Sequence, residues 1–136
     1  AIRNNVDSRV NFLEGDLFGP LEGKGLEGKA QMVLSNPPYV PLTEREKLEP
    51  EVRDYEPHAA LFGGEDGLAF YRRIIREAPS YLMKGGYLIL EIGWGQANEI
   101  TGLLKAEKYE DVFVRKDYAG IERVVRARVR RASRLD

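Results

Sequence analysis

The apolar residues of this chain fall into short runs between turn-forming residues, and these runs predict several strands. Residues 10–18 begin as a short strand that Gly15 and Asp16 end. Residues 30–35 form a second short apolar strand, ended by prolines. Residues 87–93 are nearly all apolar, which is typical of a strand buried on both faces of a parallel sheet. Two further strands around a tight turn at 117–120 predict an antiparallel hairpin.

Apolar positions three and four residues apart predict two helices between these strands. The first covers 67–78, with Asp66 as its N-cap, and the second covers 96–109. The order strand, strand, helix, strand, helix, hairpin predicts an α/β sheet of parallel strands with an antiparallel edge. Ligands bind beyond the carboxyl ends of such strands, where Asp16 and Asn36 are expected.

The remaining segments are interpreted as connections. Residues 40–65 form a long Pro- and Gly-rich connection with one helical turn, a kind of loop that is often functional. Gly63-Gly64 and Gly85-Gly86 are interpreted as turns, because neither follows a strand in a phosphate-loop pattern. Trp94 is interpreted as a packing residue. In the basic segment 123–134, alternation on an edge strand would turn the arginines toward solvent, and contact with RNA is the alternative.

Composition narrows the possible functions. The 136 residues are enough for one domain, and the net charge of −1 gives no overall attraction to nucleic acid or membranes. There is no cysteine and one histidine, His58, so disulfides, thiolate metal sites and histidine metal clusters are excluded and no metal is expected. No apolar run approaches the roughly 20 residues that span a bilayer. The absence of cysteine fits a reducing compartment such as the cytoplasm.

The tetrapeptide Asn36-Pro37-Pro38-Tyr39 is the strongest chemical signal in the chain. The prolines restrict the backbone and have no N–H, so this segment offers carbonyl acceptors and few donors. The Asn36 side chain adds another acceptor, and Tyr39 can lie flat on a planar group. Such a pair of oxygens could hold both hydrogens of an NH₂ group and favour the positive charge that develops when its nitrogen attacks an electrophile. The alternative interpretation is a loop whose prolines only end the strand.

A set of sequence blocks resembles the HemK/PrmC-type release-factor glutamine N5-methyltransferases over essentially the whole chain. The blocks are GDLF (15–18), SNPPYV (35–40), EV-x-x-YEP-x-AAL-x-GG-x-DGL-x-x-YR (51–72), GGYLILEIGWGQ (85–96) and DYAGIERVV (117–125). The tetrapeptide alone also occurs in enzymes that methylate amino groups of DNA and RNA. The blocks after it are what single out the glutamine enzymes.

The resemblance implies a class I, Rossmann-like methyltransferase fold that uses S-adenosylmethionine. It implies methyl transfer to the side-chain amide of the glutamine in the Gly-Gly-Gln loop of peptide-chain release factors. The implied residue roles are these: Asn36, Pro37 and Tyr39 as catalytic residues; Asn36, Pro37, Pro38, Tyr39 and Glu56 as substrate-binding residues; Asp16, Leu17 and Asn36 as cofactor-binding residues.

The chain departs from the family pattern in its first part. The Gly-rich loop after the first strand, the acidic residue after the second and the N-terminal helical domain are not found in it. We therefore expect residues 1–136 to be the C-terminal portion of a methyltransferase catalytic domain. A sheet without its first strands would expose an edge and apolar surface, which predicts self-association or partial disorder.

Two alternative functions remain open at this point. One is a nucleic-acid amino-methyltransferase, which the near-neutral charge and the lack of a visible base-recognition domain disfavour. The other is a non-catalytic module that binds a Gly-Gly-Gln loop without using the cofactor, which the missing glycine loop favours.

Overall fold

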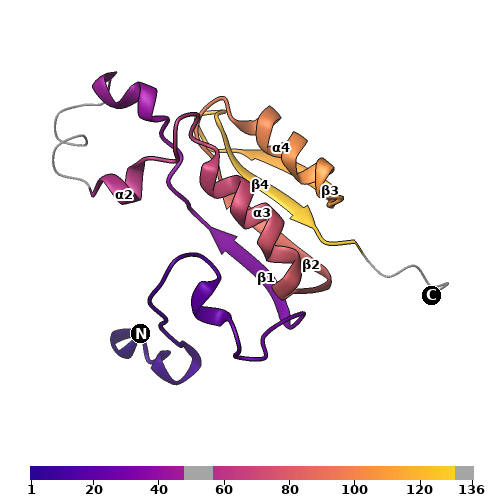
Figure 1. Cartoon of the computed structure of the whole chain (residues 1–136). Helices are drawn as coiled ribbons and strands as arrows, with labels where there is room; N and C mark the ends of the chain where they lie inside the picture. Colours follow the sequence, from indigo (N-terminus) through magenta and orange to yellow (C-terminus); the bar gives the residue numbers. More distant parts are fainter. Residues whose placement is uncertain (48–56, 131–136) are drawn as a thin grey trace.

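The computed structural model describes residues 1–47 and 57–130, which contain a four-stranded sheet with the order β1-β2-β4-β3 (Figure 1). β1 and β2 are parallel, and the other two pairs are antiparallel. This confirms a mixed sheet with a C-terminal hairpin. The strands are β1 (Ala30–Ser35), β2 (Leu82–Glu91), β3 (Glu110–Lys116) and β4 (Glu122–Arg128).

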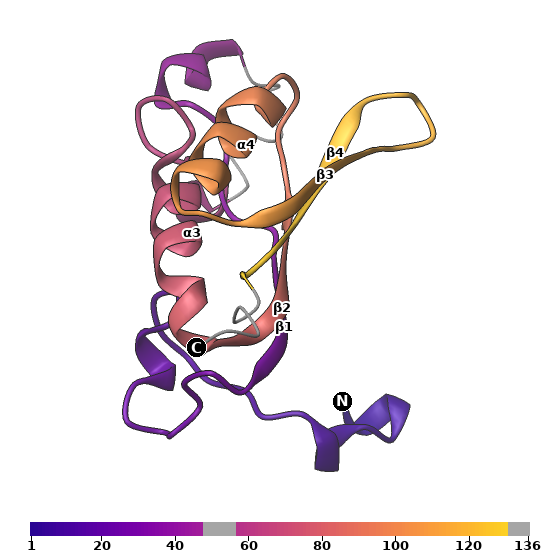
Figure 2. The same cartoon turned by 90° about the vertical axis from the view of Figure 1, so that its right-hand side faces the viewer.

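Two helices, α3 (Ala69–Tyr81) and α4 (Ala97–Ala106), cover the same face of the sheet (Figure 2). The core lies between these two layers. Its largest fully buried side chains are Tyr71, Ile74, Ile75, Leu88, Leu90, Ile92, Ile100, Leu104 and Val125. The shorter helices are α2 (His58–Leu61) and the 3₁₀ turns η1 (Ile2–Asn4), η2 (Asp7–Arg9), η3 (Gly19–Leu21) and η4 (Leu42–Lys47).

The strand predicted at 87–93 is longer than expected and begins at Leu82. Gly85 and Gly86 lie inside it, so the prediction that they separate two elements is wrong. They form an irregularity instead: Ala30 pairs with Leu82, but the next paired residue of β1, Met32, pairs with Tyr87. Gly85 has φ +81°, and a Cβ on Gly86 would lie 2.9 Å from the Met83 carbonyl oxygen.

The first helix continues through Pro79 to Tyr81, beyond its predicted end. Proline has no N–H, so the Ile75 carbonyl one turn earlier loses its helical partner. The Tyr109 hydroxyl, which follows α4, donates a hydrogen bond of 2.9 Å to that carbonyl. Burial raises the pKa of Tyr109 far above its ordinary value, so the hydroxyl keeps the proton that it donates.

The predicted strand at 10–18 does not form, and this prediction is wrong. Phe12 is 80% exposed, and Val10 and Leu13 are also exposed. A strand needs a neighbour to receive its backbone hydrogen bonds, and within the described residues none lies beside this segment. Only its end is anchored: the Phe18 ring stacks on Tyr81 with 5.1 Å between ring centroids.

The basic C-terminal strand was predicted at an edge, and the described part of it corrects this. β4 lies between β2 and β3. The alternation is confirmed at Arg126, which is exposed between the buried Val125 and Ala127. It does not hold for Arg128, whose side chain is 17% exposed and pairs with Asp111. The Arg126 guanidinium lies 5.4 Å and 5.6 Å from the ring centroids of Tyr87 and Phe113.

The edges of the described sheet are β3 and β1. β1 has one neighbour among the described strands, β2. Met32 and Leu34 on this strand are 47% and 69% exposed.

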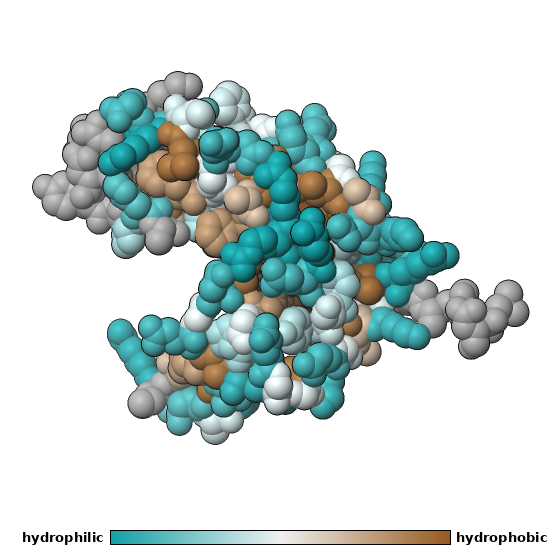
Figure 3. Space-filling model, in the orientation of Figure 1, coloured by the Kyte–Doolittle hydropathy of each residue, from teal (hydrophilic) through white to brown (hydrophobic). Residues whose placement is uncertain are grey.

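On the face shown in Figure 3, hydrophobic residues form separate patches among hydrophilic ones. Within the described residues, no helix is both long and apolar enough to cross a bilayer.

Candidate functional site

The Asn36–Tyr39 segment forms the corner at which the chain leaves β1. Asn36 is exposed, Pro37 is buried, and Pro38 and Tyr39 are half-buried. Beyond the corner, the Val40 N–H donates to the Leu61 carbonyl (2.9 Å), and the Gly63 N–H donates to the Val40 carbonyl (3.0 Å). The prolines therefore end the strand as predicted, and the chain then pairs with residues 61–63.

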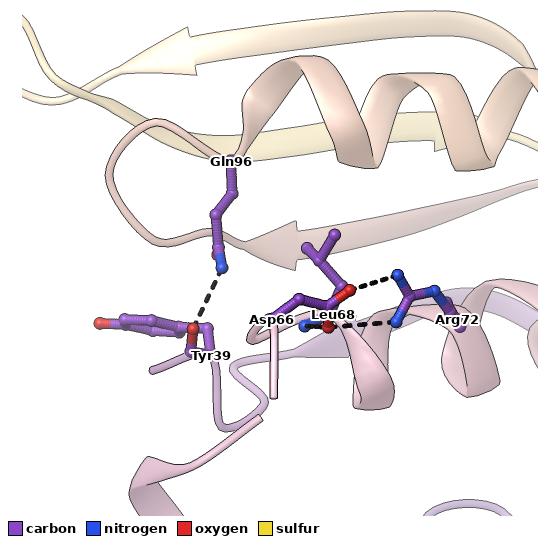
Figure 4. A network of polar contacts seen from close by, with 5 residues as sticks. All are labelled: Tyr39, Asp66, Leu68, Arg72 and Gln96. Carbon is purple, nitrogen blue, oxygen red and sulfur yellow. Dashed lines mark hydrogen bonds and ion pairs between the residues drawn. The ribbon is translucent and has the colours of Figure 1, made fainter. Parts of the chain in front are cut away.

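A glutamine side chain joins this corner to the loop after β2. Gln96 Nε2 donates to the Tyr39 carbonyl at 3.0 Å (Figure 4). Gln96 Oε1 accepts from the Gly93 N–H at 3.0 Å. We call this pair of contacts the Gln96 clip. It brings together residues that are 57 positions apart in the sequence.

Three glycines allow the backbone to approach the corner closely. A Cβ on Gly67, whose φ is +75°, would lie 2.3 Å from the Tyr39 carbonyl oxygen. One on Gly63 would lie 2.6 Å from the Pro38 carbonyl oxygen, and one on Gly93 would lie 2.9 Å from Tyr39 Cδ2. Real Cβ atoms do not approach so closely, so any larger residue at these positions would displace the corner.

The buried hydroxyl of Tyr71 holds the end of β2 beside the site. The Tyr71 hydroxyl, on α3, donates to the Glu91 carbonyl at 2.8 Å, at the end of β2. Desolvation raises the pKa of Tyr71 far above its ordinary value, and the nearby Tyr39 raises it further. Tyr71 therefore stays neutral and acts as a hydrogen-bond donor rather than as a general base.

A pocket of about 620 Å³ opens beside the corner. Its lining residues come from both loops and from the start of α3: Tyr39, Val40, Pro41, Glu44, Asp66, Leu68, Arg72, Gly93, Trp94, Gly95, Gln96 and Glu99. Asp66 accepts hydrogen bonds of 3.1 Å and 2.5 Å from Arg72 and one of 3.0 Å from the Leu68 N–H. These bonds, that to Arg72 most strongly, lower the pKa of Asp66 to about 2. Asp66 therefore binds the Leu68 N–H just before α3. The N-cap of the helix is Leu68, so the prediction that Asp66 is the N-cap is wrong by two residues.

The structure brings some of the predicted site residues together and separates others. Asn36, Pro37, Pro38 and Tyr39 form one corner at the carboxyl end of β1, as expected for parallel strands. Asp16 and Leu17 are not part of it, because residues 1–29 lie toward the opposite end of the sheet (Figures 1 and 2). Glu56 lies outside the described residues.

The Asp16 carboxylate binds Arg73 of α3 at 2.7 Å. It lines a second pocket of about 460 Å³, which shares no lining residue with the first. Leu17 has φ +45° and is half-buried against the core. The expectation that Asp16 follows the carboxyl end of a strand is therefore wrong, because no strand forms there.

Sequence reasoning missed the residues that hold the corner. The sequence places Gln96 at the start of a helix, and both Gln96 and Gly67 inside the family blocks, but it gives neither residue a role in the site. Trp94 was interpreted as a packing residue, which is wrong, because its side chain is 83% exposed at the pocket. The available signal was a Gly-Trp-Gly-Gln turn directly after a strand end, where a polar side chain is well placed to reach a neighbouring loop.

Several curated relatives of this chain share one name, although no family model matches it. Release factor glutamine methyltransferases from Geobacter sulfurreducens and Thermodesulfovibrio yellowstonii are 47% and 45% identical over 122 residues, which is 90% of this chain. The protein of that name from Synechocystis is 44% identical over 126 residues, or 92% of the chain. The chain spans 42% of the length of each of these relatives. The resemblance read from the sequence blocks is confirmed.

Two solved structures resemble this chain, and one of them bears on the fold. A candidate DNA modification methylase from Thermus thermophilus is similar with a TM-score of 0.50 and 18% identity, over 81% of this chain and 50% of the other. A release factor-specific protein-(glutamine-N5) methyltransferase from Alicyclobacillus acidocaldarius is 35% identical over 48% of this chain and 42% of the other, with a TM-score of 0.41. The likeness to the Thermus thermophilus protein shows a shared fold, in line with the Rossmann-like methyltransferase fold that the resemblance implied.

Proposed function

We propose that this chain supplies the substrate side of a methyltransferase active site. The reaction would move a methyl group from S-adenosylmethionine to the side-chain amide nitrogen of a glutamine, in the Gly-Gly-Gln motif of peptide-chain release factors. Such an enzyme would act in the cytoplasm, where release factors work, with a protein rather than a nucleic acid as substrate. The names of the relatives support this reaction, although they are longer proteins.

The observation that carries the proposal is the corner at Asn36–Tyr39. The exposed Asn36 amide makes no hydrogen bond within the described residues, so its oxygen is available to a ligand. In the proposal, this oxygen and the Pro37 carbonyl accept the two N–H bonds of the substrate amide. Pro38 shapes the backbone between them, and the Tyr39 ring packs on the planar amide. Glu56 would help to shape the path by which the substrate enters.

These contacts would do two things for the reaction. A glutamine amide nitrogen is a poor nucleophile, because its lone pair is delocalised into the carbonyl. Holding both N–H bonds orients that nitrogen, and two oxygens facing it favour the positive charge that develops as it is methylated. The methylated nitrogen then loses one proton, and Tyr71 is not its acceptor, because the raised pKa keeps this hydroxyl protonated.

The proposed cofactor contacts are Asp16, Leu17 and Asn36, and they do not form one cradle in the described residues. The Asp16 carboxylate is paired with Arg73, and Leu17 packs on the core. S-adenosylmethionine has a nucleoside end and an amino-acid end, so a complete cofactor site needs residues that bind each end. We therefore propose that residues 1–136 correspond to the C-terminal portion of a catalytic domain, and that other protein segments complete the cofactor site.

The first test is calorimetric titration of the chain with S-adenosylmethionine, followed by a methylation assay on a release factor. We expect mass spectrometry to find one added methyl group on the glutamine of the Gly-Gly-Gln motif. A release factor with that glutamine replaced by glutamate keeps the shape but loses the NH₂ group, and it should not be modified. Methylation at another residue would contradict the proposal.

The two alternatives give different outcomes in the same assay. Methyl transfer to DNA or RNA that is lost in Asn36→Ala would identify a nucleic-acid amino-methyltransferase. Binding of a release factor with no methylation, even after the remaining part of a relative is added in trans, would identify a non-catalytic module. The fold likeness to a candidate DNA methylase favours neither, because the fold is common to all of them.

A further inference from the structure

The Gln96 side chain uses both ends of its amide, and the chemistry determines which way the amide faces. One end meets an N–H donor, that of Gly93, and the other meets an acceptor, the Tyr39 carbonyl. An amide turned by 180° would place two donors together at Gly93 and two acceptors together at Tyr39. The observed orientation is therefore the one that satisfies both partners, with Nε2 directed at Tyr39.

The clip is mounted on a rigid part of the fold. Gln96 is the residue before α4, and its carbonyl accepts the Ile100 N–H at 3.1 Å. Its own N–H donates to the Gly93 carbonyl at 3.3 Å, so the Gly93 residue is held at both its N–H and its C=O. Ala97 and Ile100 bury the first turn of α4 in the core, at 4% and 0% exposed. The position of Nε2 is thereby tied to the core.

The peptide group that Gln96 holds is also bound from the other side. The Tyr39 carbonyl and the Val40 N–H belong to one planar unit. Gln96 donates to its carbonyl (3.0 Å), and its N–H donates to the Leu61 carbonyl (2.9 Å). Two bonds from two separate segments fix the plane of this unit. Fixing that plane restricts the backbone of Tyr39 and hence the direction of its ring.

We propose that Gln96 is a positioning residue, which fixes the backbone of Tyr39 so that the tyrosine ring and the Pro37 carbonyl face the substrate amide together. This inference rests on the proposed function and adds a residue to it. Gln96 would not touch the substrate; it would act through Tyr39. The close fit of Gly67 supports this role, because any side chain there would enter the space between Gln96 Nε2 (2.9 Å) and the Tyr39 carbonyl (2.3 Å).

The experiment exploits the difference between an amide and a carboxyl at this position. Gln96→Glu has the same shape and keeps the acceptor for Gly93, but its carboxylate cannot donate to the Tyr39 carbonyl. Once protonated, the introduced carboxyl can donate again. We expect this variant to bind a Gly-Gly-Gln peptide about tenfold more weakly than wild type near neutral pH. Its affinity should recover as pH falls toward the ordinary glutamate pKa of about 4.3.

Trp94 is the only tryptophan in the chain and lines the same pocket, so its fluorescence reports peptide binding directly. The wild-type chain titrated over the same pH range corrects for the carboxyl groups that line the pocket, Glu44, Asp66 and Glu99, and for the peptide. Asn98→Ala, on the exposed surface of α4, is the matched control and should bind as wild type does. Gln96→Leu can neither donate nor accept, so its binding should be weak at every pH.

Two results would overturn the inference. One is wild-type affinity of Gln96→Leu, and the other is equal weakening of Gln96→Glu at all pH values, which would indicate a purely structural role. Amide hydrogen exchange at Gly93 separates this inference from the proposed function. If the wild-type chain binds no peptide, the proposed function fails for this chain. The rate of amide hydrogen exchange at Gly93 then tests the Gln96 clip by itself. Equally slow exchange in wild type and Gln96→Leu would then exclude it.

Discussion

Two segments of this chain look alike in sequence and differ in structure. Residues 10–18 and β1 each begin with apolar residues and lead to a short polar side chain, Asp16 in one and Asn36 in the other. β1 forms a strand that pairs with β2, whereas 10–18 forms none. Asn36 therefore stands at the end of a parallel strand, and Asp16 forms an exposed ion pair with Arg73.

The difference shows that a strand-like sequence pattern forms a strand only where another strand lies beside it. Both segments have the composition of a strand, but of the two only β1 has, among residues 1–47 and 57–130, a neighbour to take up its backbone hydrogen bonds. The corner after β1 is then held by contacts from three other segments: the Gln96 side chain, the Leu61 carbonyl and the close approach of Gly67. Among the described residues, the Asp16 side chain has one hydrogen-bond partner from another segment, Arg73 of α3.

The largest contrast is expected in activity. If the corner holds the substrate amide, Asn36→Ala should lower the rate of glutamine methylation by about 10²–10³, by analogy with loss of an oxyanion-hole donor. Asp16→Ala removes an exposed ion pair worth about 0–1 kcal/mol. At saturating S-adenosylmethionine, where a weakened cofactor contact no longer limits the rate, its effect should therefore be less than about tenfold. Single-turnover rates with the completed enzyme would measure both. Equal losses would show that Asp16 contributes as much as the corner does.

The second contrast is within segment 10–18, between its two phenylalanines. Phe18 is 9% exposed and stacks on Tyr81, so Phe18→Ala should lower the free energy of unfolding by about 3 kcal/mol. Phe12 is 80% exposed, and Phe12→Ala should change that free energy by less than about 0.5 kcal/mol. Urea unfolding curves would measure both. A large effect at Phe12 would mean that this segment packs on the protein in solution.

The third prediction concerns the open edge at β1. With Leu34 69% exposed beside one neighbouring strand, we expect the chain to self-associate as concentration rises. Leu34→Lys places a charge on that surface and should weaken association about tenfold or more. Sedimentation velocity over a concentration series would measure it, with Phe12→Lys as the control on the unpaired segment. A monomeric wild-type chain with a cooperative melt would contradict the prediction.

The smallest effect is expected from pH at the ion pair beside the corner. The pKa of Asp66 is lowered from 3.8 to about 2, chiefly by Arg72 and the Leu68 N–H. A lowered carboxyl pKa stabilises the fold above the unfolded pKa near 3.8, and this contribution is lost as pH falls toward 2. Because both side chains are about half exposed, it should be no more than about 1 kcal/mol.

Asp66→Asn should remove that part of the pH dependence. Urea unfolding of both proteins near pH 5 and near pH 2 would measure the difference, and the other carboxyl groups cancel in the comparison. A difference between the two proteins that is the same at both pH values would mean that the ionised form of Asp66 contributes no stability.

Much of the fold could be read from the chain. The helices at 67–78 and 96–109 were found to within a few residues, because their apolar positions repeat with the helical period. The hairpin was found because Asp117 is suited to a turn, and its carboxylate does accept the N–H groups of Ala119 and Ile121. The pattern at 10–18 predicts a strand where the structure has none, because residue propensity carries no information about which strand would lie beside it.

The sequence by itself determined which residue types stand at the corner: two prolines that end a strand, an amide with a free oxygen and an aromatic ring. These are local properties, since a proline restricts its own backbone wherever it lies. Only the tertiary structure decided what holds that corner in place. Gln96 reaches Tyr39 across 57 positions, and Gly67 makes room for the contact. Such contacts depend on how β1, β2 and α4 pack, which no short stretch of sequence encodes.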